Sequence, residues 1–398
     1  MKEVLRPDQG FPAKVLWTLA IIGGVSVANL YYNQPLLGLI RADLHISEFQ
    51  ANLIAMVTQA GYALGLFFIV PMGDLFKRKK IVLTNFFLLI LSLILIGLSQ
   101  NIWVLLMASL VTGVCSIVPQ IFVPIAAQYS TPKNKGRNVG IIISGLLTGI
   151  LASRVFSGFI GAYFGWRYVF FIATIFMLIS TIVVVYMLPE TNPTFKGNYK
   201  GLMRSILSLI VKYPSLLLYS SRAGLAFGAF LMMWSTLAFK MQLAPFHAGS
   251  NIVGMLGLCG ITGALAASFV GKYIQQVGVP TFNVIGCCLI LSAWGLFFFV
   301  ENSYVGIISG IILIDVGMQC IQLSNQTSVF EVCPDATSRI NTIFMTIYFI
   351  GGSLGTLLAG FAWRFAEWHG VVFVGVCLTV ASLSITIIEK SVFHYRSA

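Results

Sequence analysis

The stretch GLLTGILASRVFSG, residues 145–158, decides the class of the fold, because it holds a single charge in an otherwise apolar or small-residue run. The charge is that of Arg154, whose guanidinium stays protonated in proteins. The run extends on both sides to the roughly 20 residues that a helix needs to cross a bilayer. We therefore expect a membrane helix with a buried cation, and a buried cation needs a partner.

The composition of the whole chain also indicates a membrane protein. Of its 398 residues, 58% are hydrophobic and 9% are charged, whereas soluble domains carry about 25% charged residues. The apolar runs are long and lack strand alternation, which predicts helices in lipid. Twelve candidate spans follow one another, at 14–37, 49–72, 81–99, 102–129, 139–163, 168–188, 216–243, 251–271, 280–300, 304–329, 339–362 and 370–388. We expect an all-α, multi-pass protein with the lipid bilayer as its solvent.

The net charge of +12 does not indicate a nucleic-acid partner, because most of the 24 Lys and Arg lie in alternate loops. The densest cluster is KRKK at 77–80, and only Arg41, Arg167 and Arg364 fall in loops of the other side. Basic loops favour the cytoplasmic side of a membrane. We expect both termini in the cytoplasm, and a first span that is retained because its charged start precedes no evident cleavage site.

The chain divides into two halves with one plan. The polar stretch 189–215 is predicted as a cytoplasmic linker between an N-terminal six-helix bundle, 1–188, and a C-terminal six-helix bundle, 216–398. The halves align at a constant offset, which pairs Gln120 with Gln322, Pro132 with Pro334, Arg137 with Arg339 and Trp166 with Trp368. Parallel repeats of this kind are typical of secondary transporters.

Four motifs carry a resemblance to a known family: NLYYNQPLL (29–37), PMGDLFKRKK (71–80), YFGWRYVF (163–170) and PDATSRINT (334–342). With them, the sequence resembles the major facilitator superfamily over its whole length, and within it a bacterial branch close to the drug-and-metabolite proton antiporters. The resemblance implies alternating access in the bacterial cytoplasmic (inner) membrane, with no cofactor. We expect a monomer that binds a small-molecule substrate and protons.

The loop after the second span matches a family motif through Asp74, Arg78 and Lys79. The resemblance favours a cytoplasmic gate, in which Asp74 and Arg78 hold the two halves together. The alternative is that the cations of this loop only anchor the topology against anionic lipid.

Glycines recur at close spacing in four spans, as Gly61 and Gly65, Gly145 and Gly149, Gly254 to Gly263, and Gly351 and Gly355. Small residues let helices approach closely in lipid. The resemblance places these four spans at the two helix pairs that slide when the halves move, so we expect the glycines at those contacts. Tight packing and homodimerisation are the alternatives.

Polar side chains form one stripe on the tenth span, where Asp315, Gln319, Gln322 and Gln326 share a helical face. Polar residues inside a bundle usually face its interior or a wet cavity. We predict a substrate-binding wall, completed by residues of the first, fourth and seventh spans that the resemblance places around a central cavity: Asn29, Tyr32, Asn33, Gln120 and Trp234. The alternative is that these groups only hydrogen-bond helices together.

Arg154 and Asp315 lie at similar predicted depths, since the fifth and tenth spans run in opposite directions. We predict that they face one cavity and interact, directly or through water or substrate. Separation of the pair during the movement of the halves would let Asp315 take up a proton. A fixed structural ion pair is the alternative.

The sequence contains no group that indicates an enzyme. The histidines lie in predicted loops or the tail, and no metal-ligand spacing or phosphate loop is present. We expect a secondary active transporter, first by proton-coupled efflux, second by uptake symport or facilitation, and third a receptor or scaffold on the same fold. Ser109 and Arg154 depart from the antiporter pattern, which has Arg and Pro at these places.

Overall fold

The computed structural model describes residues 12–131, 133–191, 193, 197–333 and 336–397. The charged start of the chain, on which the retained first span was argued, lies outside these residues. Every regular element in the described ranges is a helix. The elements of the first half are α1 (Ala13–Ala28), η1 (Gln34–Leu36), α2 (Leu37–Leu44), α3 (Glu48–Phe68), η2 (Val70–Asp74), α4 (Arg78–Leu98), α5 (Ile102–Cys115), α6 (Val118–Tyr129), α7 (Lys135–Phe164) and α8 (Trp166–Met187).

The rest of the chain repeats this plan after one extra helix, α9. Its elements are α9 (Tyr199–Lys212), α10 (Ser215–Gln242), α11 (Ser250–Leu256), η3 (Gly257–Gly260), α12 (Ile261–Val277), α13 (Val279–Phe299), α14 (Tyr304–Val332) and α15 (Thr337–Ser397). Within the described residues, ten segments are long and apolar enough to cross a membrane, and α1 is a shorter apolar helix. The all-helical membrane fold is confirmed. Twelve crossings are consistent with it, because α15 contains two helices joined at a kink at Ala366 and Glu367.

Helix breaks fall where the backbone chemistry requires them. The fourth predicted span is divided into α5 and α6 at Ser116 and Ile117, just before Pro119, which lacks the N–H of a helix interior. The eighth is divided by the 3₁₀ turn η3, which begins and ends with glycine. The first span ends its α-helix at Ala28 and continues through turns into η1. These breaks change which side chains face inward.

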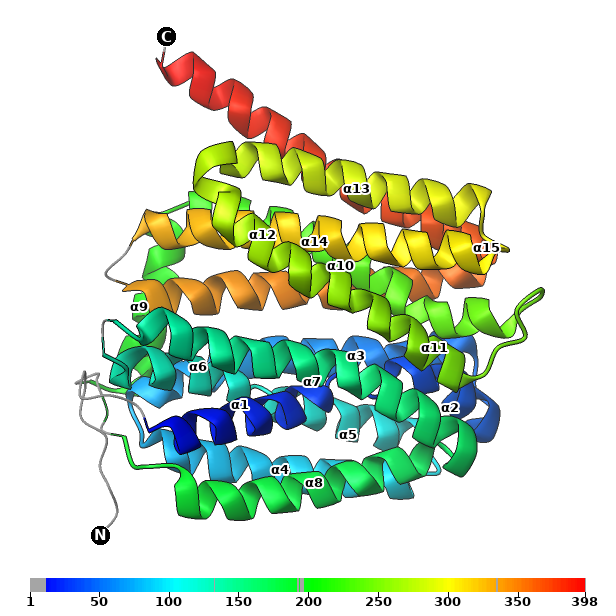
Figure 1. The fold of residues 1–398 in the computed structure, drawn as a ribbon, viewed down its shortest axis with the longest axis horizontal. Helices are drawn as coiled ribbons and strands as arrows, with labels where there is room; N and C mark the ends of the chain where they lie inside the picture. The colour runs from blue at the N-terminus through cyan, green and yellow to red at the C-terminus, as the bar shows by residue number, and fades with distance from the viewer. Residues whose placement is uncertain (1–11, 132, 192, 194–196, 334–335, 398) are drawn as a thin grey trace.

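Figure 1 shows the helices of the first half, α1 to α8, in the lower part of the molecule and α10 to α15 in the upper part. The short helix α2, the kink of α15 and the α10–α11 connection lie at the right, which we call the closed end. Helix α9, the end of α14 and the start of α15 lie at the left, the linker end. The predicted linker contains the helix α9, which buries Leu202, Ile206 and Leu209.

The two halves touch each other at the closed end. Helix α3 packs along α15, where Asn52 donates a hydrogen bond to Thr356 O and Ser353 donates one to Met56 O. Helix α7 packs along α11, where Ser250 Oγ donates to Gly158 O at 2.9 Å. Toward the linker end, α7 and α12 diverge (Figure 1). The halves therefore enclose a space that is shut at the closed end.

The glycine contacts mostly lie within a half, so the prediction that they mark the sliding pairs is wrong for three of the four spans. The backbone of Gly149 in α7 contacts that of Gly24 in α1, and Gly351 in α15 contacts Gly224 in α10. Likewise, the glycines of α3 contact the α5 backbone. Of the four glycine sets, that of the eighth span contacts the other half, where Gly254 meets Gly158 and Gly257 meets Arg154. The glycines thus fix helix pairs inside each half.

Candidate functional site

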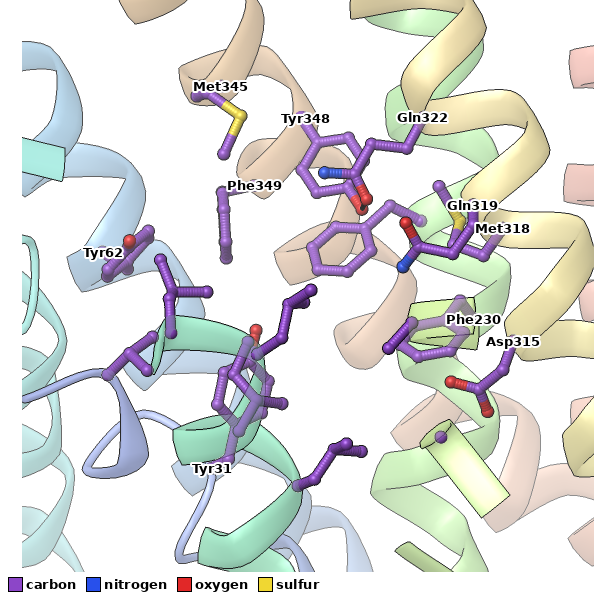
Figure 2. Close-up of a pocket in the computed structure, with 18 of the residues that line it drawn as sticks. Tyr31, Tyr62, Phe230, Asp315, Met318, Gln319, Gln322, Met345, Tyr348 and Phe349 are labelled. Atoms are coloured by element: carbon purple, nitrogen blue, oxygen red, sulfur yellow. Dashed lines mark hydrogen bonds between the residues drawn. The ribbon is translucent and has the colours of Figure 1, made fainter. Parts of the chain in front are cut away.

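A cavity of about 140 Å³ lies between the halves, at the middle of the helices. Figure 2 shows its wall, to which α3, α10, α14 and α15 contribute labelled side chains. Its lining is mainly apolar and aromatic, with Arg154 and Asp315 as its two charged members. Largely apolar walls with few polar groups are typical of sites for small molecules. The second, fifth, eighth and eleventh spans also line it, beyond the four that the resemblance implied.

Arg154 is 2% exposed and lies at the point where α7 meets η3. Its guanidinium stacks on the ring of Trp234, 3.9 Å from the ring centroid, and its Nε donates to Gln34 Oε1 at 3.0 Å. Desolvated cation–π contacts stabilise a cation by about 2 kcal/mol. The terminal nitrogens have no further partner in the described part of the chain, and they are not sealed from the cavity. The cation is thus held in place while its donors stay available.

Asp315 is 7% exposed and lines the same cavity from α14. Its carboxylate points into the open space beside Phe230 (Figure 2). Among the described residues, Oδ2 is buried without a hydrogen-bond partner. A Cβ on Gly260 would lie 3.5 Å from Asp315 Oδ1 and 3.9 Å from Arg154 Nη1, so both groups border one small space. They are not joined by an ion pair, because no nitrogen of Arg154 comes within 4.0 Å of the carboxylate.

The rest of the tenth-span stripe divides along the helix. Gln319 and Gln322 line the cavity, and Gln322 Oε1 accepts a hydrogen bond from Tyr348 at 3.1 Å. Gln326 lies outside the lining and donates to Asn341 Oδ1 at 3.1 Å. Gln120 of α6 lines the opposite wall and donates to the Tyr62 hydroxyl at 3.3 Å.

The first-span residues are placed differently from the prediction. Asn29 donates to carbonyls of its own helix, and Asn33 donates to Thr58 of α3. Tyr32 packs on Phe156, whereas its neighbour Tyr31 lines the cavity. The α-helix ends at Ala28, so helical spacing no longer applies from Asn29 onward. Trp234 is not in the lining either, but it holds Arg154 from behind.

An aromatic wall of the cavity was missed by sequence reasoning. Tyr348 of α15 stacks on Phe227 of α10 with ring centroids 3.9 Å apart, and Phe349 packs on Tyr62 across the two halves at 4.4 Å. Aromatic residues occur in every predicted span, so nothing in the sequence marks these. Gln34 could have been found, since it stands in the NLYYNQPLL motif.

The predicted gate residues lie at the linker end around η2. Arg78 approaches Asp74 at 3.6 Å, donates to Gln128 at 2.9 Å and donates to Gly73 O. Lys79 donates to carbonyl oxygens at the end of α8 and just beyond it. All these partners of Arg78 belong to the first half, so the gate stays a prediction.

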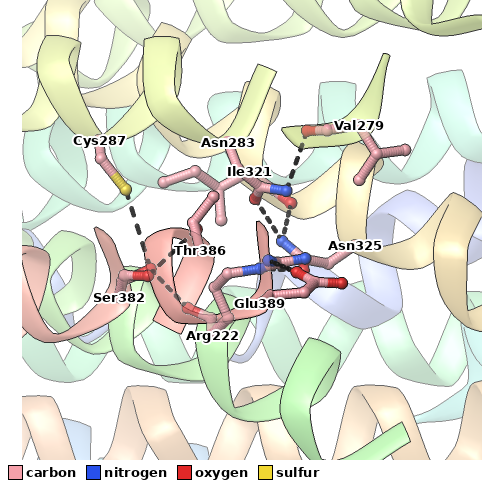
Figure 3. Close-up of polar contacts among 9 residues, drawn as sticks. All are labelled: Arg222, Val279, Asn283, Cys287, Ile321, Asn325, Ser382, Thr386 and Glu389. Atoms are coloured by element: carbon pink, nitrogen blue, oxygen red, sulfur yellow. Dashed lines mark hydrogen bonds and ion pairs between the residues drawn. The ribbon is translucent and has the colours of Figure 1, made fainter. Parts of the chain in front are cut away.

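An ion pair lies among the helices of the second half, outside the lining of the cavity. Arg222 of α10 forms an ion pair with Glu389 of α15, and its Nε donates to Asn325 of α14 at 2.6 Å (Figure 3). Asn325 in turn donates to Asn283 of α13 at 2.7 Å. This network joins four helices, and none of its members lines the cavity. It was not predicted from the sequence.

Comparison with known proteins agrees with this architecture. The family model described as Major Facilitator Superfamily matches residues 19–387. An uncharacterized transporter of Escherichia coli O157:H7, YgaY, is 32% identical over 95% of this chain and 96% of its own length. A probable transporter of Streptomyces coelicolor is 27% identical over 89% of this chain and 82% of its own.

The fold is also similar to that of solved transporters. The crystal structure of a point mutant of the nucleoside transporter NupG matches 94% of this chain and 99% of its own, with a TM-score of 0.78 and 11% identity. At that identity the likeness concerns the fold alone. The family match covers most of the chain and agrees with the paired helices and the enclosed cavity. This chain therefore belongs to the Major Facilitator Superfamily and is a membrane transporter rather than an enzyme.

Proposed function

We propose that this chain exports a small, moderately polar or amphiphilic molecule in exchange for protons, by alternating access of its central cavity. The observation that carries the proposal is a cavity shut at the closed end, with a buried, unpartnered carboxylate oxygen of Asp315 in its wall. A carboxyl group without a fixed partner is suited to gain and lose a proton as its surroundings change.

Arg154 supports a coupling between that proton and the movement of the halves. Its carbonyl oxygen would lie 2.5 Å from a Cβ on Gly254, so its backbone forms part of the α7–α11 contact. When the halves separate at the closed end, the guanidinium moves relative to Asp315. A nearby cation favours the ionised carboxylate, so this movement changes how readily Asp315 binds a proton.

The larger organisation belongs to the same proposal. Residues 1–188 and 216–398 form the two moving six-helix bundles, the linker 189–215 faces the cytoplasm together with both termini, and the twelve spans lie in the bacterial inner membrane. The gate of Asp74, Arg78 and Lys79 then closes at the linker end when the closed end opens. The protein works as a monomer with no cofactor.

A flux measurement on a mixture of candidate substrates tests the proposal. Proteoliposomes are loaded with an isotope-labelled extract of bacterial metabolites, and an outward-acid pH gradient is imposed. Mass spectrometry then follows which compounds leave. Gradient-driven loss of one or a few compounds, abolished in folded Asp315→Asn protein and kept in Asp43→Asn protein, is the expected result.

Other outcomes separate the alternatives. Loss of a compound that does not depend on the pH gradient indicates a facilitator. When the same extract is supplied outside instead, gradient-driven accumulation of a compound inside indicates uptake by symport. No movement of any compound indicates a receptor or scaffold. If Arg154→Ala and Asp315→Asn both unfold and the charge swap restores folding, the two residues form a structural pair and not a coupling device.

A further inference from the structure

We propose that the central cavity selects an amphoteric substrate, a small molecule that carries an ammonium-type donor and a carboxylate-type acceptor on one apolar or aromatic body. The inference rests on the proposed transport function and specifies its substrate class. It follows from the two charged groups of the cavity, which face the same space without pairing with each other.

The guanidinium of Arg154 supplies the anion-binding half of the site. Trp234 and Gln34 fix its plane and its Nε, and the terminal nitrogens remain accessible without a partner in the described residues. A planar guanidinium that presents two free donors matches a carboxylate by geometry as well as by charge. Lys would not replace it, because an ammonium neither stacks as a plane nor offers a fork of donors.

Asp315 supplies the cation-binding half. Its side chain is more than nine-tenths buried, and the orphaned Oδ2 costs free energy as long as it lacks a donor. A substrate ammonium group would provide that donor. The neighbouring Gln319, which also points into the cavity (Figure 2), offers a further neutral hydrogen-bonding group.

The spacing of the two charges fits a compact head group. Both lie within 4 Å of the Cβ position of Gly260. Their separation, roughly 7.5 Å at most, leaves room for two charge-assisted hydrogen bonds with one small head group between them. Gly260 keeps this space open, and its Cβ position lies 2.6 Å from Leu151, so a larger residue would crowd the site.

The balance of charge disfavours a singly charged ligand. The lining contributes one positive and one negative side chain, so a plain cation would pair with Asp315 and leave its charge near Arg154. A plain anion would pair with Arg154 and leave its charge near Asp315. A zwitterion satisfies both groups, and the rings of Phe227, Phe230 and Tyr348 are placed to cover its apolar body.

Binding to the detergent-purified full-length chain tests this inference without a transport assay. Isothermal titration compares two matched series: phenylalanine with phenethylamine and phenylpropionate, and leucine with isopentylamine and isocaproate. In at least one series, the zwitterion should bind about tenfold or more tightly than either singly charged analogue, because each analogue loses one charge-assisted hydrogen bond and leaves a protein charge unpaired.

Variants assign the binding to the two charges. In Asp315→Asn the preference for the zwitterion over the acid should disappear, and in Arg154→Gln the preference over the amine should disappear. Asp43→Asn and Arg364→Gln remove equivalent groups far from the cavity and should change neither preference. Thermal unfolding of each variant shows whether it is folded, and Gly260→Val, which fills the space with both charges retained, should weaken zwitterion binding independently.

Each outcome decides for or against the inference. A singly charged analogue that binds as tightly as its zwitterion, binding of no zwitterion at all, or preferences that the cavity variants leave unchanged would overturn it. In those cases metabolite flux through proteoliposomes can still support the proposed function. Conversely, a zwitterion that binds with the expected variant pattern but never crosses the membrane leaves the inference standing and refutes the transport proposal.

Discussion

Replacing Gly158 by Ala should open the closed end of the molecule. A Cβ at this position would lie 2.5 Å from Ser250 O and 2.9 Å from Gly254 Cα, whereas an ordinary contact is nearer 3.5 to 4 Å between carbon atoms. Because the obstructing atoms are backbone, α7 and α11 must move apart by about 1 Å or lose their contact. Overpacking of this kind costs about 1–3 kcal/mol.

That cost falls on one conformation only. Once the halves separate at the closed end, residue 158 no longer meets α11, so the substitution shifts the equilibrium toward the open form by about 5- to 150-fold. The shift is measured by electron–electron distance spectroscopy between spin labels at Tyr163 and Phe299, which are exposed at the closed end, one in each half. The population with the longer distance should increase in Gly158→Ala.

Two glycines of the same helix serve as controls. Gly140 has no atom within 4 Å of its Cβ position, so Gly140→Ala should leave the distances unchanged. A Cβ on Gly149 would lie 2.2 Å from the carbonyl oxygen of Gly24 within the first half, so Gly149→Ala should lower thermal stability without a specific opening. An unchanged distance distribution in Gly158→Ala, or an equal shift in Gly140→Ala, would refute the reasoning.

Three further predictions concern the topology, the cavity wall and the network of Arg222, Glu389 and Asn325. Single cysteines at Lys79 and Arg364, in a background without other cysteines, should be labelled by an impermeant reagent on intact cells at 364 and not at 79; the reverse pattern would end the topology proposal. Gln319→Ala should weaken binding or flux of an identified substrate several-fold with little loss of stability, and half-exposed Ile308→Ala on the same helix should change neither; equal effects would contradict the cavity assignment. Arg222→Met should lower the free energy of unfolding by about 1–3 kcal/mol, because it leaves the partly buried carboxylate of Glu389 and the buried Asn325 without their donor. Replacement of Arg222 and Glu389 together by apolar residues should restore part of the loss; thermal or denaturant unfolding that shows no loss in the single variant would exclude a structural role.

Much of the fold could be predicted from the sequence, because the bilayer imposes one length and one composition on every crossing. Each predicted span coincides with a helix or a run of joined helices. The kink of α15 at Ala366 and Glu367 falls between the predicted spans 339–362 and 370–388, where the sequence analysis placed a loop. The breaks inside single spans were less accessible, although Pro119 stands at the one between α5 and α6.

The candidate site could be predicted only where regular helical geometry continues. Asp315, Gln319 and Gln322 lie on uninterrupted α14, so their spacing places them on one face correctly. Tyr32 and Asn33 follow the end of α1, where turns replace the helix, and the same reasoning gives the wrong face.

Which helices contact each other could not be predicted from the sequence, for a different reason. Glycine spacing shows that a helix has a groove but does not name the helix that enters it, so Gly351 was assigned across the halves and instead meets Gly224. The partner of Arg222 is 167 residues away in the chain, and the packing of α10 against α15 brings them together.

The position of Arg154 has a consequence for how events in this protein can be ordered in time. Its carbonyl oxygen and Cβ abut Gly254 and Gly257 across the boundary between the halves, while its guanidinium lies in the cavity wall. Helix α7 is also joined backbone to backbone with α1 through Gly149 and Gly24. In the proposed transport cycle, opening of the closed end and loss of the binding geometry around Arg154 therefore belong to one step, and we expect no intermediate in which the closed end is open and the binding geometry is intact.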